Sequence, residues 1–346
     1  MISISNYRSK TTRRLVVFLS VVLVVLFCSS LVMGRFEINV SDIGAMVTAF
    51  FSGTAVGEDL VSKQLVFWWI RLPRCIMAVL VGMGLSVSGA VYQALFRNPL
   101  VSPDILGVAA GCTFGAALGL VLPGGNFSLV HILSFGFGLA AVALAVGIAR
   151  LISVKPLIVL VLAGMVVMSF FNALLMVLKY FSDPFDELPS IVFWIMGSLS
   201  RVTWDDLLII APVTGIALTG FMLLRFRLNI LSLGDIQSKS LGMNPAVFRS
   251  VFIVASSFIV AMTVATCGQI SWIGLIIPHM ARTLVGPEHE RMLPVTALLG
   301  AIFLLGADGA ARSVSSAEIP VGIITALTGA PIFGFLLYKN RGSGWL

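Results

Sequence analysis

The sequence predicts an all-α polytopic membrane protein with ten transmembrane helices. Of its 346 residues, 58% are hydrophobic and 11% are charged, and the mean hydropathy is +1.06. A soluble domain of this length needs far more charge to cover its surface. Apolar stretches of about 20 residues, the length that crosses ~30 Å of hydrocarbon, recur along the chain. The sequence lacks the period-two alternation that is typical of a membrane β-barrel.

We expect a single transmembrane domain over residues 1–346, with an uncleaved first span. No small-residue cleavage site follows that span, so we do not interpret it as a secretion signal. The eighth span is the least regular, because Pro278, His279 and Arg282 interrupt it. The predicted spans are residues 15–33, 76–96, 105–122, 129–151, 157–181, 207–224, 247–266, 270–284, 293–310 and 319–337.

The distribution of charge predicts the orientation. With ten spans and a cytoplasmic N-terminus, most of the 22 basic residues fall inside and most of the 15 acidic residues fall outside. Without the eighth span, Arg291, Lys339 and Arg341 would move outside. We therefore expect a multi-pass membrane protein with both termini in the cytoplasm.

Several outer segments are expected to line a pathway without crossing the membrane. Residues 40–52 are amphipathic, residues 65–74 carry Trp68 and Trp69, and residues 191–200 form a partial helix. Irregular backbone at membrane depth is tolerated only where protein or a water-filled cavity covers it.

The third span carries a glycine at every fourth position, which makes a smooth groove along one helix face. A moving interface and tight static packing both fit this pattern, and static packing is the simpler interpretation. The glycines are Gly107, Gly111, Gly115 and Gly119.

The sequence carries no recognisable energy source or catalytic motif. There is no GxxxxGK[ST] phosphate-binding loop, no HExxH and no GxSxG, so we expect no enzyme activity and no bound cofactor. The four cysteines form no CxxC pair, and the three histidines share no metal-ligand spacing. Asp308 is expected to pair with Arg312 one turn along its helix. An ion-gradient-driven secondary transporter would need coupling-ion ligands and an intramembrane enzyme would need a catalytic constellation, and neither is found.

A polar loop at about residues 228–246, between the sixth and seventh spans, is the strongest candidate for a contact site. Leu233, Ile236 and Leu241 recur at helical spacing, and Gly234 and Gly242 interrupt the pattern. Two short helices with one apolar face are expected. That face either rests on the bilayer or docks a partner protein.

At this point the chain resembles the FecCD/BtuC-like permease family of ABC importers, which take up iron–siderophore complexes, haem and vitamin B12. The resemblance runs from about Arg71 to Phe335 in the family's order. It is carried by RLPR (71–74), SGAVYQALFRNPL (88–100), PDILG (103–107), LG (233–234), GLIIPHMAR (274–282), EIPVG (318–322) and GAPIF (329–333).

The resemblance implies a complex. A second permease, either an identical copy or a close paralogue, would complete the pathway, and two ATPase subunits carrying ATP and Mg would dock on the loop at Leu233, Gly234, Ile236, Leu241 and Gly242. A periplasmic binding protein would deliver the cargo, and no nucleic acid is involved. A ferric siderophore is the expected cargo, with haem, cobalamin or molybdate as alternatives. Gene neighbours encoding an ATPase and a secreted binding protein would favour this class over a secondary transporter.

The resemblance also implies site residues and an internal symmetry. Spans two to five and seven to ten would be inverted halves, and Ser153 and Val154 fall where the family places its cytoplasmic gate. Arginines at the positions of Arg71, Arg74 and Arg312 would meet acidic residues of the binding protein. The alternative is that Arg71 and Arg74 reach the lipid headgroups and Arg312 pairs with Asp308.

Overall fold

The computed structural model describes residues 2–34, 36–53, 57–123, 127–152, 156–315 and 318–339, and every regular element in these residues is a helix. The first half contains α1 (Ile2–Val32), α2 (Val40–Ser52), α3 (Glu58–Leu65), η1 (Val66–Arg71), α4 (Leu72–Phe96), η2 (Pro103–Leu106), α5 (Val108–Val121), α6 (Phe127–Ile152) and α7 (Pro156–Phe181). The second half contains α8 (Glu187–Ile195), α9 (Trp204–Leu233), α10 (Asp235–Ser240), α11 (Pro245–Cys267), α12 (Ile273–Val285), α13 (His289–Ser313) and α14 (Val321–Lys339).

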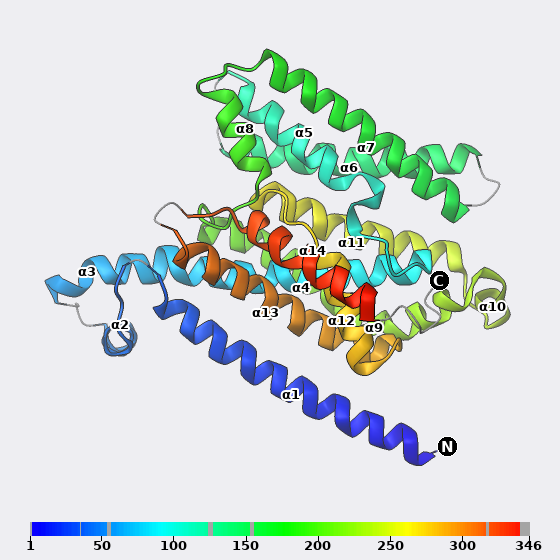
Figure 1. Ribbon diagram of the computed structural model, residues 1–346, viewed down its shortest axis with the longest axis horizontal. Coiled ribbons are helices and arrows are strands. Elements are labelled where there is room, and N and C mark those ends of the chain that lie inside the picture. The colour runs from blue at the N-terminus through cyan, green and yellow to red at the C-terminus, as the bar shows by residue number, and fades with distance from the viewer. Residues whose placement is uncertain are drawn as a thin grey trace.

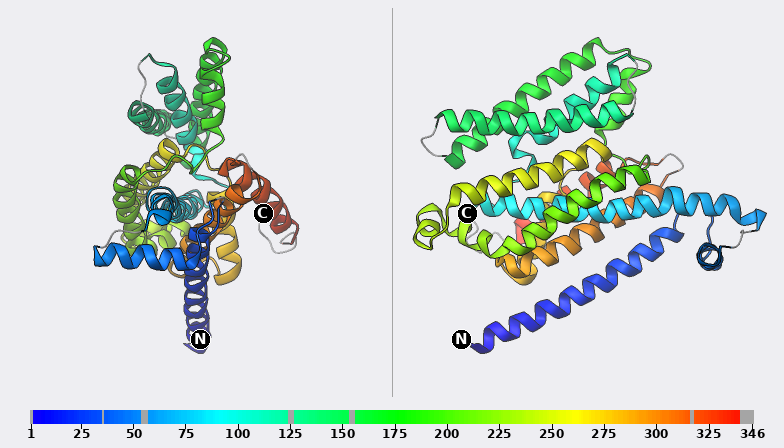
Figure 2. Two further views of the ribbon diagram at one scale, coloured as in Figure 1. Left: turned by 90° about the vertical axis from the view of Figure 1, so that its left-hand side faces the viewer. Right: turned by 180° about the vertical axis from the view of Figure 1, so that it is seen from behind.

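Helix α4 runs through the middle of the bundle, with α9, α11, α12 and α13 around it (Figure 1). Helices α5 to α8 form a layer on one side, and α1 lies along the opposite side (Figures 1 and 2). Glycines on α4 permit this central position. A Cβ atom on Gly82 would lie 2.3 Å from the carbonyl oxygen of Gly300 on α13, and one on Gly89 would lie 1.8 Å from that of Gly274 on α12. The backbones can approach this closely only because these positions carry no side chain.

The ten predicted apolar segments are all helical, although two of them are short. Among the described residues, eight helices are long and apolar enough to cross a membrane, while α5 and α12 have only 14 and 13 residues. Each short helix follows backbone with a positive φ, at Gly107 (φ 80°) before α5 and at Trp272 (φ 74°) before α12. Both helices pack inside the bundle, where protein covers the irregular backbone that precedes them.

The two halves share one succession of helices. Helices α4, α5, α6 and α7 are long, short, long and long, and so are α11, α12, α13 and α14. In Figure 1, α4 and α11 run in opposite directions across the bundle. Both features are what inverted halves require.

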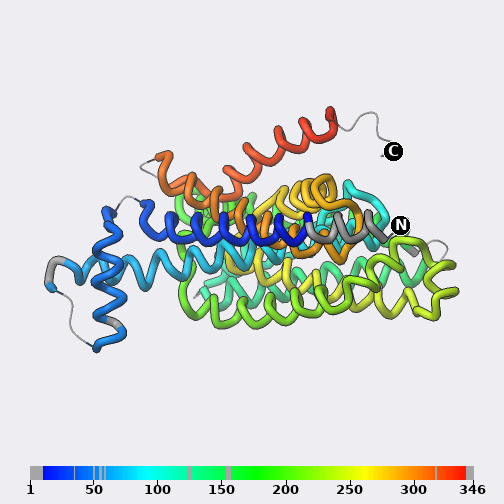
Figure 3. The backbone as a smooth tube through the Cα atoms, turned by 90° about the horizontal axis from the view of Figure 1, so that it is seen from below, coloured from blue at the N-terminus to red at the C-terminus, as the bar shows by residue number. Residues whose placement is uncertain are grey.

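The outer segments differ from the prediction in extent. Residues 65–74 do not form a separate segment, because α3, η1 and α4 follow one another without a break as a 37-residue apolar stretch from Leu60 to Phe96. At 1.5 Å per residue this stretch is about 55 Å long, so its α3 end projects beyond ~30 Å of hydrocarbon. Helix α2 crosses this end of the bundle (Figure 3). The partial helix predicted at 191–200 is α8, which begins earlier, at Glu187.

The glycine stripe packs α5 tightly against α6. Cβ atoms on Gly111 and Gly115 would lie 2.4 Å and 2.3 Å from carbonyl oxygens of α6, and one on Gly119 would lie 2.8 Å from the Cα atom of Val130. Gly107 is not part of this contact, since it ends η2 and faces α7. The predicted close approach of the two helices is confirmed, and the choice between a moving interface and static packing stays a prediction.

The two ends of the bundle are distinct. Helix α1 begins and α14 ends at the same end as α10, and α2 and α3 lie at the opposite end (Figures 1 and 2). We call these the α10 end and the α2 end. The shared position of the first and last helical turns agrees with an even number of crossings.

Candidate functional site

The α10 end carries a short helix whose start depends on one glycine. Helix α9 ends at Leu233, and Gly234 then adopts φ 115° and ψ 166°, a conformation that L side chains rarely adopt. A Cβ atom there would lie 2.8 Å from Oε1 of Gln237 and 3.1 Å from Nη1 of Arg97. The chain therefore turns sharply at Gly234 and enters α10 at Asp235. One short helix follows rather than the predicted two, because α9 itself continues through residues 228–233.

Hydrogen bonds and an ion pair hold α10 against its neighbours. The buried Ser238 hydroxyl lies 3.0 Å from the carbonyl oxygen of Ile230 and 2.6 Å from that of Gly234. Nη2 of Arg249 on α11 lies 2.6 Å from Oδ1 of Asp235. Met243, just beyond α10, is 2% exposed and anchors the return of the chain into α11. The short helix is thus fixed to both α9 and α11.

The outward side of this segment is apolar. Leu233, Ile236 and Leu241 are 57%, 78% and 58% exposed. We call these three residues the α10 surface. Large apolar side chains held in one place at a polar end of the molecule indicate a contact with another molecule. Burial of each would contribute roughly 1.5–3 kcal/mol.

A second turn lies beside α9 at the same end. Oδ1 of Asn229 accepts a hydrogen bond from the backbone N–H of His289, at 2.9 Å, and lies 2.7 Å from Nδ1 of the same histidine. This contact ties the α12–α13 connection to the helix that leads into α10. We did not single out Asn229 or His289 from the sequence. The sequence around Asn229 gives no indication that this residue binds another one 60 positions further along the chain.

At the α2 end, a buried cluster of charge joins α4 to α13. Asp308 is fully buried; Nε of Arg74 donates a hydrogen bond to its Oδ1 at 2.8 Å, and Nε of Arg312 forms an ion pair with its Oδ2 at 3.0 Å. Nη1 of Arg74 also lies 2.8 Å from Oε2 of Glu318, which is 38% exposed. Arg312 reaches α1 as well, where its Nη1 donates to the carbonyl oxygen of Met33 at 3.1 Å. We call Arg74, Asp308, Arg312 and Glu318 the outer charge cluster.

Arg71 lies beside this cluster and binds backbone. Its Nη1 donates to the carbonyl oxygens of Leu31 and Val32 at 2.8 Å and 2.7 Å, and its Nη2 donates to that of Phe36. These bonds fasten the end of α1 to η1. Arg71 is consequently only 4% exposed.

The predicted docking arginines are therefore buried rather than exposed. Arg71, Arg74 and Arg312 are 4%, 4% and 6% exposed, because carboxylates and carbonyl oxygens of this chain surround them. The predicted pair of Arg312 with Asp308 is confirmed. Docking of a binding protein through these arginines stays a prediction, and any such partner would meet Glu318 first.

Other predicted features fall outside these two sites. The gate residues Ser153 and Val154 lie outside the described residues. Among the residues that the structure describes, no group of three or more His, Cys, Asp or Glu side chains could hold a metal ion. The four cysteines are free thiols: Cys28 is exposed, and Cys75, Cys112 and Cys267 are buried.

The long and short apolar helices are those of a multi-pass membrane protein. The chain belongs to the FecCD transport family, which matches residues 22–339. A solved structure described as an inward-facing conformation of a metal-chelate type ABC transporter superimposes with a TM-score of 0.84. It is 39% identical, and the match covers 94% of this chain and 99% of that one. The chain is thus an ABC importer permease.

Relatives with different named cargoes are similarly close. The molybdate import permease MolB of Haemophilus influenzae is 42% identical over 94% of this chain and 96% of its own length. A probable iron chelatin permease of Helicobacter pylori is 41% identical over 82% of this chain and 86% of its own. The vitamin B12 import permease BtuC of Klebsiella pneumoniae is 39% identical over 83% of this chain and 87% of its own.

Proposed function

We propose that this chain forms the translocation pathway of an importer for a metal chelate, with a ferric siderophore as the first candidate, and that a separate ATPase drives it. The observation that carries the proposal is the α10 surface. Three exposed apolar side chains lie on and beside α10, a helix that Ser238 and the Arg249–Asp235 pair hold in place. Because the α10 surface is held rigidly, it can transmit a movement of a docked partner to α9 and α11.

The proposal places the α10 end in the cytoplasm of a bacterial inner membrane and the α2 end outside. The connections between helices at the α10 end are rich in Lys and Arg, and the charge distribution assigns such loops to the inside. A second permease, either an identical copy or a paralogue, would pair with this chain, as the family resemblance implies. A periplasmic binding protein would deliver cargo at the α2 end.

The test is co-purification of the ATPase with permease variants. Changing Leu233 and Leu241 to Asp should release the ATPase from the detergent-solubilised complex, because a charge would replace apolar contacts. Ser240→Asp is the matched control, since it adds the same charge to an exposed polar position of α10 and should retain most of the ATPase. Ile236→Asp should act like the leucine changes. Undiminished co-purification in both leucine variants would move the contact elsewhere, with the α12–α13 connection as the next candidate.

Two further measurements test the energy source and the cargo separately. The purified permease alone should hydrolyse no ATP, and the complex should hydrolyse it only when the ATPase subunit is present. Proteoliposomes with the cognate binding protein should accumulate labelled ferric siderophore. Molybdate is the second candidate, because the Haemophilus influenzae relative carries that name and covers nearly the whole chain. Uptake of molybdate without uptake of the chelate would select it.

Docking of the binding protein near the outer charge cluster is proposed from the family resemblance. Glu318 is the exposed member of the cluster and pairs with Arg74. An acidic group on the binding protein could compete with Glu318 for this arginine, and rising salt would weaken that contact. Because Arg71 and Arg74 also hold α1 and α13, loss of uptake on their reversal would not separate docking from folding.

A further inference from the structure

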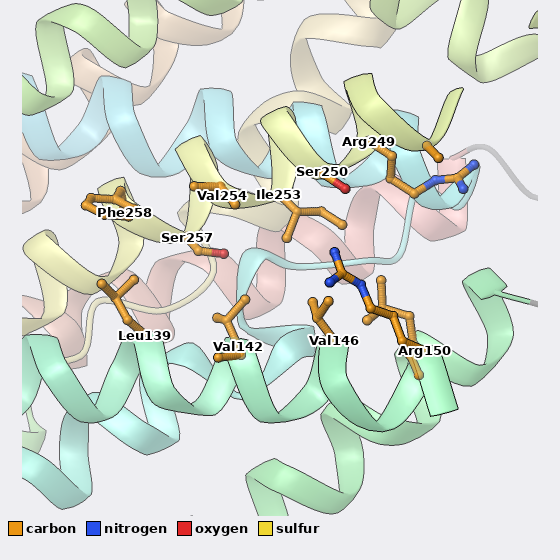
Figure 4. Close-up of a pocket in the computed structure, with 14 residues that line it drawn as sticks. Leu139, Val142, Val146, Arg150, Arg249, Ser250, Ile253, Val254, Ser257 and Phe258 are labelled. Atoms are coloured by element: carbon orange, nitrogen blue, oxygen red, sulfur yellow. The ribbon is translucent and has the colours of Figure 1, made fainter. Parts of the chain in front are cut away.

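A groove between α6 and α11 opens at the α10 end and has a volume of about 620 Å³. Its walls are apolar side chains of the two helices, and Arg150 and Arg249 stand at its mouth (Figure 4). From Arg150 to Leu139 on α6, the groove follows 11 residues of helix, or about 16 Å at 1.5 Å per residue. That length is close to half of a ~30 Å hydrocarbon core, the depth of one leaflet.

A second apolar groove, of about 590 Å³, lies on the other side of α11, against α9. The two grooves share Ser250, Val254 and Phe258, which follow one another at intervals of four residues. These three side chains therefore form a ridge on one face of α11, with an apolar groove on each side. Two acyl chains joined at one end would fit astride such a ridge.

The charge at the mouth fits an anion. Within the described residues, no acidic side chain forms an ion pair with Arg150, which is exposed and reaches from α6 toward α11 (Figure 4). Arg249 uses Nη2 to bind Asp235, but its Nε is buried and has no hydrogen-bond partner. Two arginines and one aspartate leave the mouth with a formal positive charge. Arginine N–H groups are suited to the oxygens of a phosphate.

We propose that the grooves bind one acidic phospholipid of the leaflet at the α10 end. Its phosphate lies between Arg150 and Arg249, and its acyl chains lie on either side of the Ser250–Phe258 ridge. The leaflet is cytoplasmic if the proposed orientation holds, and acidic lipids there attract basic groups at the ends of transmembrane helices. Because Arg249 also binds Asp235 of α10, the lipid headgroup lies beside the segment proposed to receive the ATPase.

The test is lipid binding to the full-length permease, measured by native mass spectrometry with phosphatidylglycerol and phosphatidylcholine of matched acyl chains. Wild type should bind phosphatidylglycerol about tenfold more tightly than phosphatidylcholine, because both carry the phosphate but the cationic choline cancels its charge and is repelled by the positively charged mouth, an electrostatic difference of about 1.4 kcal/mol. Arg150→Gln should remove most of this preference. Arg225→Gln, which removes the same charge from α9 away from the groove, should keep it.

A substitution that fills the groove tests the acyl-chain part of the proposal. Ala143 lines the groove and Leu144 beside it does not. Ala143→Trp should lower the affinity for both lipids, and Leu144→Trp should leave both unchanged. Equal binding of the two lipids by wild type, or an equal loss of preference in Arg150→Gln and Arg225→Gln, would overturn the proposal. The arginine pair of variants decides the matter even if Ala143→Trp fails to fold.

Discussion

At the scale of single residues, Asp308 is the central member of the outer charge cluster at the α2 end. Its carboxylate is fully buried and faces two arginines, each of which also binds another part of the chain. A buried charge without its counter-charge is strongly destabilising. The three arginines that family resemblance assigns to docking are therefore also needed to hold α1, α4 and α13 together.

We expect Asp308→Asn to destabilise the permease by roughly 3–5 kcal/mol, because Arg74 and Arg312 would keep their charges in a buried site without a carboxylate. The thermal midpoint of the purified protein in detergent measures the change. Glu318→Gln is the comparison, and it should cost about 0–1 kcal/mol because that carboxylate is partly exposed. Equal midpoints for the two variants would show that burial of Asp308 does not govern the stability of this end.

At the scale of elements, the best-predicted helices are those whose length equals the thickness of the bilayer. The span predicted at 129–151 is α6, Phe127–Ile152, and the span at 157–181 is α7, Pro156–Phe181. Hydropathy identifies the apolar part of a helix, and it does not detect polar turns that continue the same helix. The sixth span was consequently predicted to end at 224, whereas α9 continues past Arg225, Arg227 and Asn229 to Leu233.

The two candidate sites differ in how far the sequence could reveal them. The α10 surface could be predicted because Leu233, Ile236 and Leu241 are close together in a polar loop. The burial of Arg74 could not, because its partners Asp308 and Glu318 lie 234 and 244 residues further along the chain. Only the packing of α4 against α13 brings them together.

The contact of α5 with α6 gives a prediction at this scale. Gly115→Ala should destabilise the fold by about 1–3 kcal/mol, since the new methyl group would lie 2.3 Å from the carbonyl oxygen of Leu133 and would force the helices apart. Gly136→Ala on α6 is the control, because a Cβ atom there meets nothing within 4 Å and alanine is the better helix former. The midpoint should fall for the first variant and stay or rise for the second. A fall of the same size in both would mean that loss of glycine, rather than the contact, is responsible.

At the scale of the whole molecule, the two ends are built for different contacts. The α10 end exposes fixed apolar side chains and carries the basic mouth of the lipid groove. The α2 end buries Arg71, Arg74 and Arg312, and α2 lies across it with Asp42 bound to Lys63 of α3 at 2.7 Å. That hydrogen bond holds the pKa of the Asp42 carboxyl below its usual range. An importer needs this asymmetry, because cargo and energy arrive from opposite sides.

The proposed orientation can be tested with two engineered thiols in a Cys28→Ser background, which removes the exposed native cysteine. Ser41→Cys on α2 and Ser240→Cys on α10 are both at exposed positions. In spheroplasts, a membrane-impermeant maleimide should label Ser41→Cys at once and Ser240→Cys only after permeabilisation, because the bilayer separates the reagent from the α10 end. Labelling of Ser240→Cys in intact spheroplasts would place the α10 end outside, and the assignment of α10 to the ATPase would fail with it.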